Sequence, residues 1–304
     1  MANKKFSELG LIDYFQRIYK GRESKIFKGI GDDAAAIKIS RNKYLLQTSD
    51  MLIEGRHFRK KDNLFDIGYK SIACSLSDIA AMGGKPKFAL VSLGLPRRFS
   101  FKDVQRLSKG IKSCADKFSV NIIGGDTNRS DKLIVDVLMT GFVDSKKIVL
   151  RNNAKEGDYI FVTGSLGGSI LKKHLNFMPR VKESLFLTHK FKLNSMIDIS
   201  DGLVIDLWRI LESSRVGAVL FEDLIPISKD AKSLDEALYM GEDFELLFTV
   251  SEKEGLSLLK DMEKKKIGFP LSFMGKIMNR KYKICLVDKC GKLKELRPKG
   301  YLHF

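Results

Sequence analysis

Acidic residues beside glycines, or at the ends of predicted strands and helices, most constrain how this chain can fold. They occur in Gly31-Asp32-Asp33, Thr48-Ser49-Asp50, Ser77-Asp78, Gly124-Gly125-Asp126, Asp198-Ile199-Ser200-Asp201-Gly202 and Gly241-Glu242-Asp243. With 54 Lys+Arg against 37 Asp+Glu, the chain does not need these acids for solubility. Carboxylates in such positions are typical ligands of hard cations, which predicts magnesium carrying a phosphorylated substrate.

Length and composition predict an ordinary globular protein of two domains. The 304 residues, 44% of them hydrophobic, suffice for a large buried core. The formal net charge of +17 would also suit a nucleic acid, an acidic membrane surface or polyphosphate. The lysines are dispersed, however, and the single run, Lys264-Lys265-Lys266, ends a predicted helix, where cations suit the helix dipole. We therefore favour a solvated, lysine-rich surface.

The cysteines and the N-terminal residues predict a cytoplasmic protein. The four cysteines form no CxxC pair and have no histidines at zinc spacing. Met1 to Lys20 is charged throughout, and no stretch reaches the roughly 18 apolar residues that a membrane span needs. We expect neither a membrane nor a nucleic acid as partner.

Strand and helix patterns are interspersed, which predicts a mixed α and β architecture. In the first part we expect helices over 64–82 and 101–118, the second capped by Ser100, and strands over 44–46, 88–93 and 133–139. A polar, lysine-rich connector then predicts a boundary between domains 1–144 and 145–304. In the second domain we expect strands over 158–162, 244–250, 273–275 and 282–287, a helix opening at Ser200-Asp201-Gly202 and a helix capped by Ser251.

The glycine-marked acids make chemical sense together as a metal cage. A nucleoside triphosphate carries about four negative charges, and carboxylates would repel it unless divalent ions lie between them. Glycine lets backbone N–H groups approach phosphates, and free N–H groups at a helix start can hold a phosphate oxygen. Taken singly, each motif is more often an Asx turn or a helix cap, so only the combination predicts the site. The chain has no GxxxxGK[ST] and no protein-kinase signature, which excludes those two kinase folds.

In this order, and over nearly the whole chain, the motifs resemble the thiamine-monophosphate kinase family, within the superfamily of aminoimidazole ribonucleotide synthetase. The matching stretches are 29–34, 48–50 with 54–58, 76–83, 122–127, Arg151, 198–203, 241–246 and 299–301. The resemblance implies an α/β (α+β) fold of two domains, with the N-terminal domain contributing strands to a β-barrel that spans a homodimer. The ATP site would lie between the domains.

The resemblance also implies an activity and its residues. The family transfers the γ-phosphoryl group of ATP directly to thiamine monophosphate, the last step of thiamine diphosphate biosynthesis. Several magnesium ions would be held by Asp33, Thr48, Ser49, Asp50, Asp78, Asp126, Asp198 and Asp201. Gly125, Asp126, Arg151 and Ser200 would contact the nucleotide, and His57, Glu242 and Tyr301 the thiamine phosphate. No side chain would act as a catalytic group, because the transfer is metal-assisted.

Two departures from the family pattern lead to expectations of their own. The segment from Leu171 to Asn194 is short, which predicts a trimmed helix in the second domain. Met240 stands where the family usually has glycine, which predicts crowding in a loop of the thiamine pocket.

Two other functions stay open. An enzyme of the same superfamily could activate an amide or another acceptor by phosphorylation, although Glu54-Gly55-Arg56-His57 and Lys299-Gly300-Tyr301 favour the kinase. A basic nucleic-acid-binding protein that kept the scaffold without the catalysis would bind with a steep salt dependence.

Overall fold

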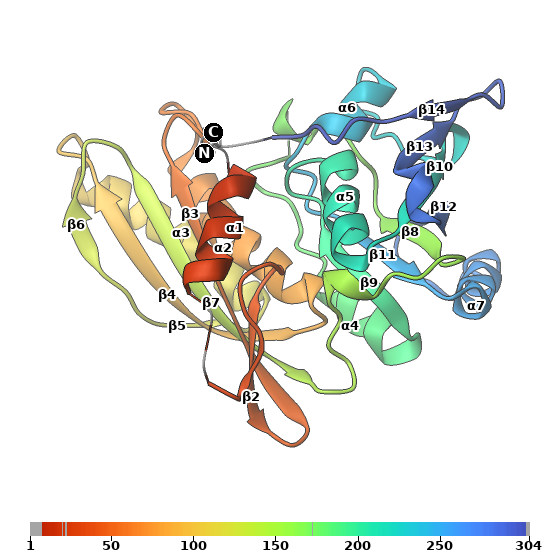
Figure 1. The fold of residues 1–304 in the computed structure, drawn as a ribbon. Coiled ribbons are helices and arrows are strands. Elements are labelled where there is room, and N and C mark those ends of the chain that lie inside the picture. The colour runs from red at the N-terminus through yellow and green to blue at the C-terminus, as the bar shows by residue number, and fades with distance from the viewer. Residues whose placement is uncertain (1–7, 20, 22, 172, 302–304) are drawn as a thin grey trace, which may run out of the picture.

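The computed structural model describes residues 8–19, 21, 23–171 and 173–301, which form two sheets with helices packed against them (Figure 1). The first sheet has seven strands in the order β1-β2-β3-β7-β4-β5, and β6 also pairs with β4. Its strands are β1 (Ile26–Lys28), β2 (Ala35–Ser40), β3 (Lys43–Ile53), β4 (Lys85–Leu95), β5 (Asn121–Gly124), β6 (Thr127–Arg129) and β7 (Ile134–Asp144). Its centre is antiparallel, and Asp50 of β3 pairs with Val137 of β7, which pairs with Val91 of β4.

One face of this sheet is covered by helices. The helices of the first half are α1 (Glu8–Ile18), α2 (Leu64–Ala81) and α3 (Phe101–Lys117). Alternate residues of β7, such as Val135 and Val137, are buried in the same core as α2 and α3, as the period of a half-covered strand requires. On the uncovered face Met51 and Leu90 are exposed. Ser100 caps α3 in a capping box, as the sequence predicts.

The second sheet is covered on both faces. Its order is β14-β13-β10-β12-β8-β11-β9. Its strands are β8 (Tyr159–Thr163), β9 (Leu193–Asp198), β10 (Gly217–Phe221), β11 (Leu246–Val250), β12 (Leu271–Met278), β13 (Ile284–Val287) and β14 (Leu293–Glu295), and its helices are α4 (Val181–Lys190), α5 (Leu203–Ser214), α6 (Leu234–Tyr239) and α7 (Glu252–Glu263). Successive residues of β8 point into two different cores: Ile160 packs with α5 and α6, and Phe161 packs with α4 and α7.

The α2 helix joins the two halves. It packs on the first sheet and also contacts α4 and β9. At the junction the Ser184 hydroxyl donates a hydrogen bond to the carbonyl oxygen of Ala80 at 2.6 Å. Phe177 and Phe244 of the second half belong to the core of the first. The last turns of α2 are therefore held rigidly where the halves meet.

The mixed architecture is confirmed, and the predicted helices over 64–82 and 101–118 each end within one residue of the observed bounds. Strands β1, β2, β5, β6, β9, β10 and β14 and helices α1 and α6 were not predicted, and α4 lies within the 171–194 segment, where a trimmed helix was expected. In the described residues the first sheet is open, ending at β1 and β5, and the expected barrel that would span two chains stays a prediction. The domain boundary at 144/145 stays a prediction.

Two further expectations concern membrane-spanning helices and the cysteines. Among the described residues, no helix has both the length and the apolar character to cross a membrane. All four cysteines are free, Cys74, Cys114 and Cys285 buried and Cys290 exposed. Part of the charged N-terminal segment, residues 1–7 and 20, lies outside the described residues.

Candidate active site

Three carboxylates converge where the two halves meet. Asp33 lies in the turn between β1 and β2, Asp78 near the end of α2, and Asp198 at the end of β9. Each offers one oxygen, and these oxygens lie within 4.8 Å of one another. Asp33 and Asp198 are buried. Like charges so placed are unfavourable without a cation between them, and an all-oxygen donor set suits magnesium or calcium. The cluster can therefore hold a divalent cation.

Hydroxyl groups fix the orientation of these carboxylates. Thr48 Oγ1 donates to Asp78 Oδ2 at 2.5 Å, and Ser77 Oγ donates to Asp198 Oδ2 at 2.7 Å. Burial, and then the neighbouring carboxylates, raise the pKa of Asp78 and of Asp198 well above the ordinary value. Without a metal, the fold therefore disfavours the ionised state that metal binding requires.

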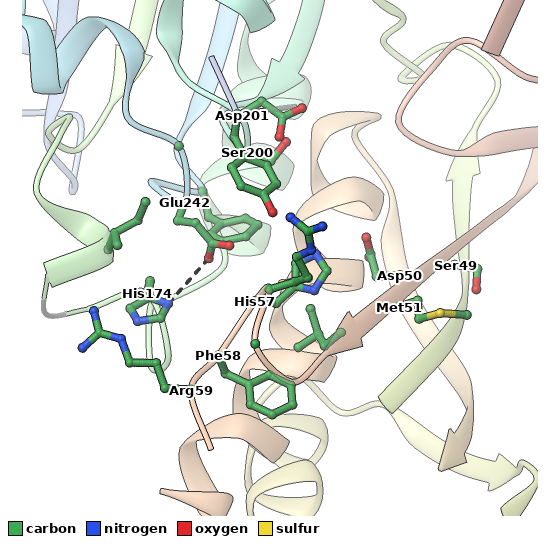
Figure 2. Close-up of a pocket in the computed structure, with 18 residues that line it drawn as sticks. Ser49, Asp50, Met51, His57, Phe58, Arg59, His174, Ser200, Asp201 and Glu242 are labelled. Carbon is green, nitrogen blue, oxygen red and sulfur yellow. Dashed lines mark ion pairs between the residues drawn. The ribbon is translucent and has the colours of Figure 1, made fainter. Parts of the chain in front are cut away.

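The predicted ligands of β3 divide between its two faces. Thr48 and Asp50 face α2, where Ser75 Oγ donates to Asp50 Oδ2 at 2.9 Å. Burial raises the pKa of Asp50 to about 6. Ser49 points the other way and donates to Asp136 Oδ1 at 3.0 Å, and Figure 2 shows the side-chain oxygens of Ser49 and Asp50 directed apart. The Ser49 hydroxyl is therefore directed away from Asp50, and its role as a metal ligand stays a prediction.

Arg151 lies beside the carboxylate cluster, in a short 3-10 helix (Arg151–Asn153). Its guanidinium contacts both oxygens of Asp33, at 2.5 and 3.3 Å, and approaches Asp32 at 3.9 Å. Burial, followed by the Asp33 charge, raises the pKa of Asp32 to about 6. A forked guanidinium at this position is suited to phosphate oxygens as well as to carboxylates.

Ser200 and Asp201 precede α5 and are held by residues that the sequence reasoning missed. Arg209 Nη2 lies 2.6 Å from Asp201 Oδ2. Asp206, which is fully buried, accepts hydrogen bonds from the backbone N–H groups of Asp201 and Gly202 at 3.0 and 3.1 Å. Burial raises the pKa of Asp206 to about 7. The loop that presents Ser200 and Asp201 is thereby fixed.

Gly125 and Asp126 lie apart from the carboxylate cluster. They follow β5, whose Gly124 pairs with Leu90 of β4, three strands along the sheet from Asp50. At about 4.8 Å per strand this is a backbone separation of roughly 14 Å. Asp126 accepts hydrogen bonds from its neighbours Thr127 and Asn128, and it lines a separate hollow of about 680 Å³ beside α3.

A cavity of about 650 Å³ lies next to the cluster and contains most of the other predicted site residues. Its lining residues are Ser49, Asp50, Met51, Leu52, Gly55, Arg56, His57, Phe58, Arg59, Cys74, Ile170, His174, Ser200, Asp201, Gly241, Glu242, Phe244 and Tyr301. Asp50 and Asp201 are thus in the same cavity as His57, Glu242 and Tyr301. Figure 2 shows Asp50 and His57 approaching the cavity from the first half of the chain, and Asp201 and Glu242 from the second.

A buried lysine of α2, Lys70, contacts one wall of the cavity, and it lies eight residues before Asp78 in the same helix. Lys70 has no exposed surface. Its ammonium group forms an ion pair with Glu242, donates to the carbonyl oxygen of His57 at 3.0 Å and lies 3.3 Å from His174 Nδ1. Glu242 also lies 3.8 Å from His174 Nδ1, the pair joined by the dashed line in Figure 2.

The loop that carries Glu242 is strained at two residues, and Met240 is not one of them. Glu242 and Phe244 have positive φ angles of 71° and 51°, a region that non-glycine residues rarely occupy outside functional sites. Met240 is extended, with φ −81° and ψ 128°, and is not among the cavity-lining residues. In these two respects, the expected effect of a side chain at position 240 is not observed.

The short 171–194 segment contributes to the site in spite of its length. It supplies His174 to the cavity, and its Phe177 ring stacks on Phe244 with centroids 3.9 Å apart. Arg180 then forms a fork with both oxygens of Glu245 at 2.6 and 2.7 Å. These contacts anchor the strained loop at Phe244 and Glu245.

Lys70 and His174 were not among the predicted site residues. The sequence does carry a signal for Lys70, because the helix Leu64–Ala81 has apolar or small residues on nearly every side. A lysine in such a helix must find buried acceptors.

The sequence matches two models of one family: the AIR synthase related protein N-terminal domain over residues 31–143, and the corresponding C-terminal domain over residues 155–287. Among curated relatives, thiamine-monophosphate kinase of Buchnera aphidicola subsp. Schizaphis graminum is 37% identical over 327 residues, covering 98% of this chain and 99% of the relative. The thiamine-monophosphate kinase of Escherichia coli K12 is 32% identical, with 96% of each chain covered.

Solved structures show the same similarity. One described as "AaThiL complexed with AMPPCP and TMP" has a TM-score of 0.85 and 28% identity, covering 100% of this chain and 99% of that chain. Thiamine monophosphate kinase from Aquifex aeolicus has a TM-score of 0.75 and 26% identity, with coverage of 95% and 99%. The hydrogenase maturation protein HypE of E. coli, at 17% identity and a TM-score of 0.72, covers 97% of this chain and 99% of its own and shares the fold alone.

Proposed function

The chain belongs to the thiamine-monophosphate kinase family of AIR synthase related proteins, and on this premise we propose that it phosphorylates thiamine monophosphate to thiamine diphosphate with ATP. One observation carries the proposal: a single cavity joins Asp50 and Asp201, on the side of the carboxylate cluster, to His57, Glu242 and Tyr301. The similar structure that contains AMPPCP and TMP supports the choice of both ligands.

The attacking group in this reaction is already a phosphate oxygen, so a strong general base is not required. The residues need to hold donor and acceptor in line and to balance the phosphate charge. Asp33, Asp78 and Asp198 would hold magnesium, which when bound neutralises phosphate charge as the phosphoryl group moves. Thr48 and Ser77 keep the carboxylates oriented through their hydroxyl groups.

The remaining predicted residues divide between nucleotide and acceptor. Arg151 and Ser200 would contact the phosphates of ATP, and the Gly125-Asp126 turn would reach the nucleotide from the edge of the first sheet. His57, Glu242 and Tyr301 would bind thiamine monophosphate. Residues 1–144 and 145–304 would act as two domains with this site between them. Four unpaired cysteines support a cytoplasmic location.

The experiment that tests the function measures both products of one reaction. The full chain is incubated with thiamine monophosphate and ATP, with and without magnesium, and nucleotides and thiamine species are separated by chromatography. We expect thiamine diphosphate and ADP in equal amounts, and only with magnesium. A folded protein that binds ATP but forms no thiamine diphosphate would contradict the proposal.

Magnesium should stabilise the protein more at neutral than at acidic pH. Burial raises the pKa of Asp50 from 3.8 to about 6, so without metal the folded state loses stability as pH rises between these values. The raised pKa values of Asp78 and Asp198 act in the same direction. A bound cation removes this penalty. We expect the rise in Tm on adding magnesium chloride to be larger at about pH 7.5 than at about pH 5, in buffers of matched ionic strength. An equal rise at both pH values would count against the carboxylate cluster as the binding site.

We also propose that the uncovered face of the first sheet forms a homodimer interface. Met51 and Leu90 are 53% and 37% exposed there, on strands whose other face is packed. Open sheets with apolar faces are closed by a partner in many proteins.

The Leu90→Glu substitution should therefore shift the chain from dimer to monomer in sedimentation velocity, because it buries a charge at the interface. Phe101→Glu is the matched control, since Phe101 is an exposed aromatic at the start of α3. A wild-type monomer at micromolar concentration would rule out the interface.

A further inference from the structure

Lys70 determines which nitrogen of His174 carries the hydrogen. An ammonium group has three N–H donors and no acceptor, and the three acceptors around Lys70 Nζ are the carboxylate of Glu242, the carbonyl oxygen of His57 and Nδ1 of His174. Nδ1 therefore accepts, and a neutral imidazole in this position carries its hydrogen on Nε2. Burial, and then the Lys70 charge, lower the pKa of His174 to about 4, so the ring is neutral near pH 7.

The Nε2 edge is the part of His174 that can contact a ligand. The side chain is 18% exposed and lines the cavity, while its Nδ1 edge is turned to Lys70 and Glu242. In the described part of the chain, no hydrogen bond of the structure uses Nε2. The Nδ1 atom of His57 is also an acceptor, because the Ile53 N–H donates a hydrogen bond to it at 3.0 Å.

This wall therefore offers a carboxylate acceptor and an imidazole donor close together. The three N–H donors of Lys70 are directed at Glu242, His57 and His174, so this cation has no further donor for a phosphate group. A 4-aminopyrimidine ring fits better, because its amino group donates and its neighbouring ring nitrogen accepts a hydrogen bond. That ring is the part of thiamine monophosphate that carries no charge, and its phosphate would then lie toward the carboxylate cluster.

We propose that His174 is a specificity-determining residue whose Nε2–H donates to a ring nitrogen of the substrate's aminopyrimidine, and that Lys70 is the positioning residue that fixes this tautomer. The inference rests on the proposed function for the identity of the substrate. The tautomer itself does not, since it follows from the contacts of Lys70.

Two substitutions separate the two edges of the ring. In His174→Asn the side-chain amide reaches the position of Nδ1, so it keeps the contact with Lys70 and loses the donor to the cavity. In His174→Gln the amide reaches the position of Nε2, so a donor to the cavity is kept. We expect the Kd and KM for thiamine monophosphate to rise about tenfold in His174→Asn and to stay within about threefold in His174→Gln. The KM for ATP should not change in either variant.

The role of Lys70 is tested by NMR of the full chain labelled with ¹⁵N-histidine. We expect His174 of the wild type to show the Nε2–H tautomer, and Lys70→Met to lose that preference and to raise the KM for thiamine monophosphate more than His174→Asn does. Lys147→Met is the control, because Lys147 also donates to a carbonyl oxygen, that of His189 at 3.2 Å, but does not line the cavity. Should Lys70→Met not fold, Lys70→Met/Glu242→Gln removes the unpaired carboxylate and keeps the NMR test available.

The outcomes distinguish the inference from the function. Equal effects of His174→Asn and His174→Gln, or an Nδ1–H tautomer in the wild type, would overturn the inference while leaving kinase activity in place. Calorimetric binding of thiamine monophosphate that depends on His174 as expected, in a protein that forms no thiamine diphosphate, would overturn the function and leave the inference standing. A wild type that does not bind thiamine monophosphate would overturn both the assigned substrate and the role of His174.

Discussion

Replacement of Asp78 by Asn should reduce magnesium-dependent formation of thiamine diphosphate by about 1,000-fold or more, because a charge-balancing ligand worth several kcal/mol in the transition state is lost. Asp78 is the member of the carboxylate cluster that comes from α2, and it shares a 4.8 Å oxygen cluster with Asp33 and Asp198. Its neutral isostere keeps the shape and the Thr48 hydroxyl as a partner.

The same substitution should not destabilise the metal-free protein. Burial and neighbouring carboxylates raise the pKa of Asp78, which means that its ionised form is unfavourable in the fold. An amide removes that repulsion, so we expect an equal or higher Tm without magnesium and a smaller rise in Tm with it. Turnover within about tenfold of wild type at limiting magnesium would contradict the assignment of Asp78 as a ligand.

The control for Asp78→Asn is Asp158→Asn. Asp158 is a buried carboxylate that accepts hydrogen bonds from Lys155 and Asn194 at the start of β8, outside the cluster. This variant should lose stability and keep the magnesium response. The pair of variants therefore separates loss of a buried acid from loss of a metal ligand.

Replacement of Arg151 by Lys should lower kcat/KM for ATP by about 100-fold, since one ammonium cannot reproduce the two-nitrogen fork. Arg151 contacts both oxygens of Asp33 and lies beside Asp32. The substitution would weaken the phosphate contact and would also leave two close carboxylates less well compensated. The measurement is steady-state kinetics with ATP varied, together with Tm.

Arg180→Lys provides the comparison, because Arg180 forms a similar fork with Glu245, which is not a member of the carboxylate cluster. Both variants should lower Tm, and only Arg151→Lys should raise the KM for ATP strongly. Equal kinetic effects of the two substitutions would mean that Arg151 acts through stability and not through the nucleotide.

The parts of the fold that the sequence predicted are those with a strong local signal. Helix α3 has apolar residues at spacings of three and four behind Ser100, and α2 ends at Ala81, two residues before Gly83, which has a φ of 73°. Strands β1 and β6 have three residues each, too few for a period to show. Strand β10 is buried along most of its length, so it lacks the alternation of a half-covered strand.

The candidate site divides in a similar way. Asp33, Asp78 and Asp198 come from separate motifs and do converge, because each motif marks a turn or an element end at the junction of the halves. A motif alone does not show where its residue lies relative to the others. Asp126 lies across the first sheet from Asp50, and the side chain of Ser49 faces away from Asp50. Lys70 and His174 contact each other although they are 104 residues apart in the sequence. Such a contact has no signature in the local sequence.

Helix α2 carries both Lys70, at the wall that would recognise the organic part of the substrate, and Asp78, at the end where phosphate would be transferred. Eight residues at 1.5 Å each make the two positions about 12 Å apart along one rigid axis. With these roles, the helix would set the distance between the site that binds the organic part of the acceptor and the site of phosphoryl transfer. Insertion of one residue between Lys70 and Asp78 would lengthen this distance and would also turn one end of the helix by about 100° relative to the other. The length of acceptor that fits and the geometry of the transfer would therefore change together.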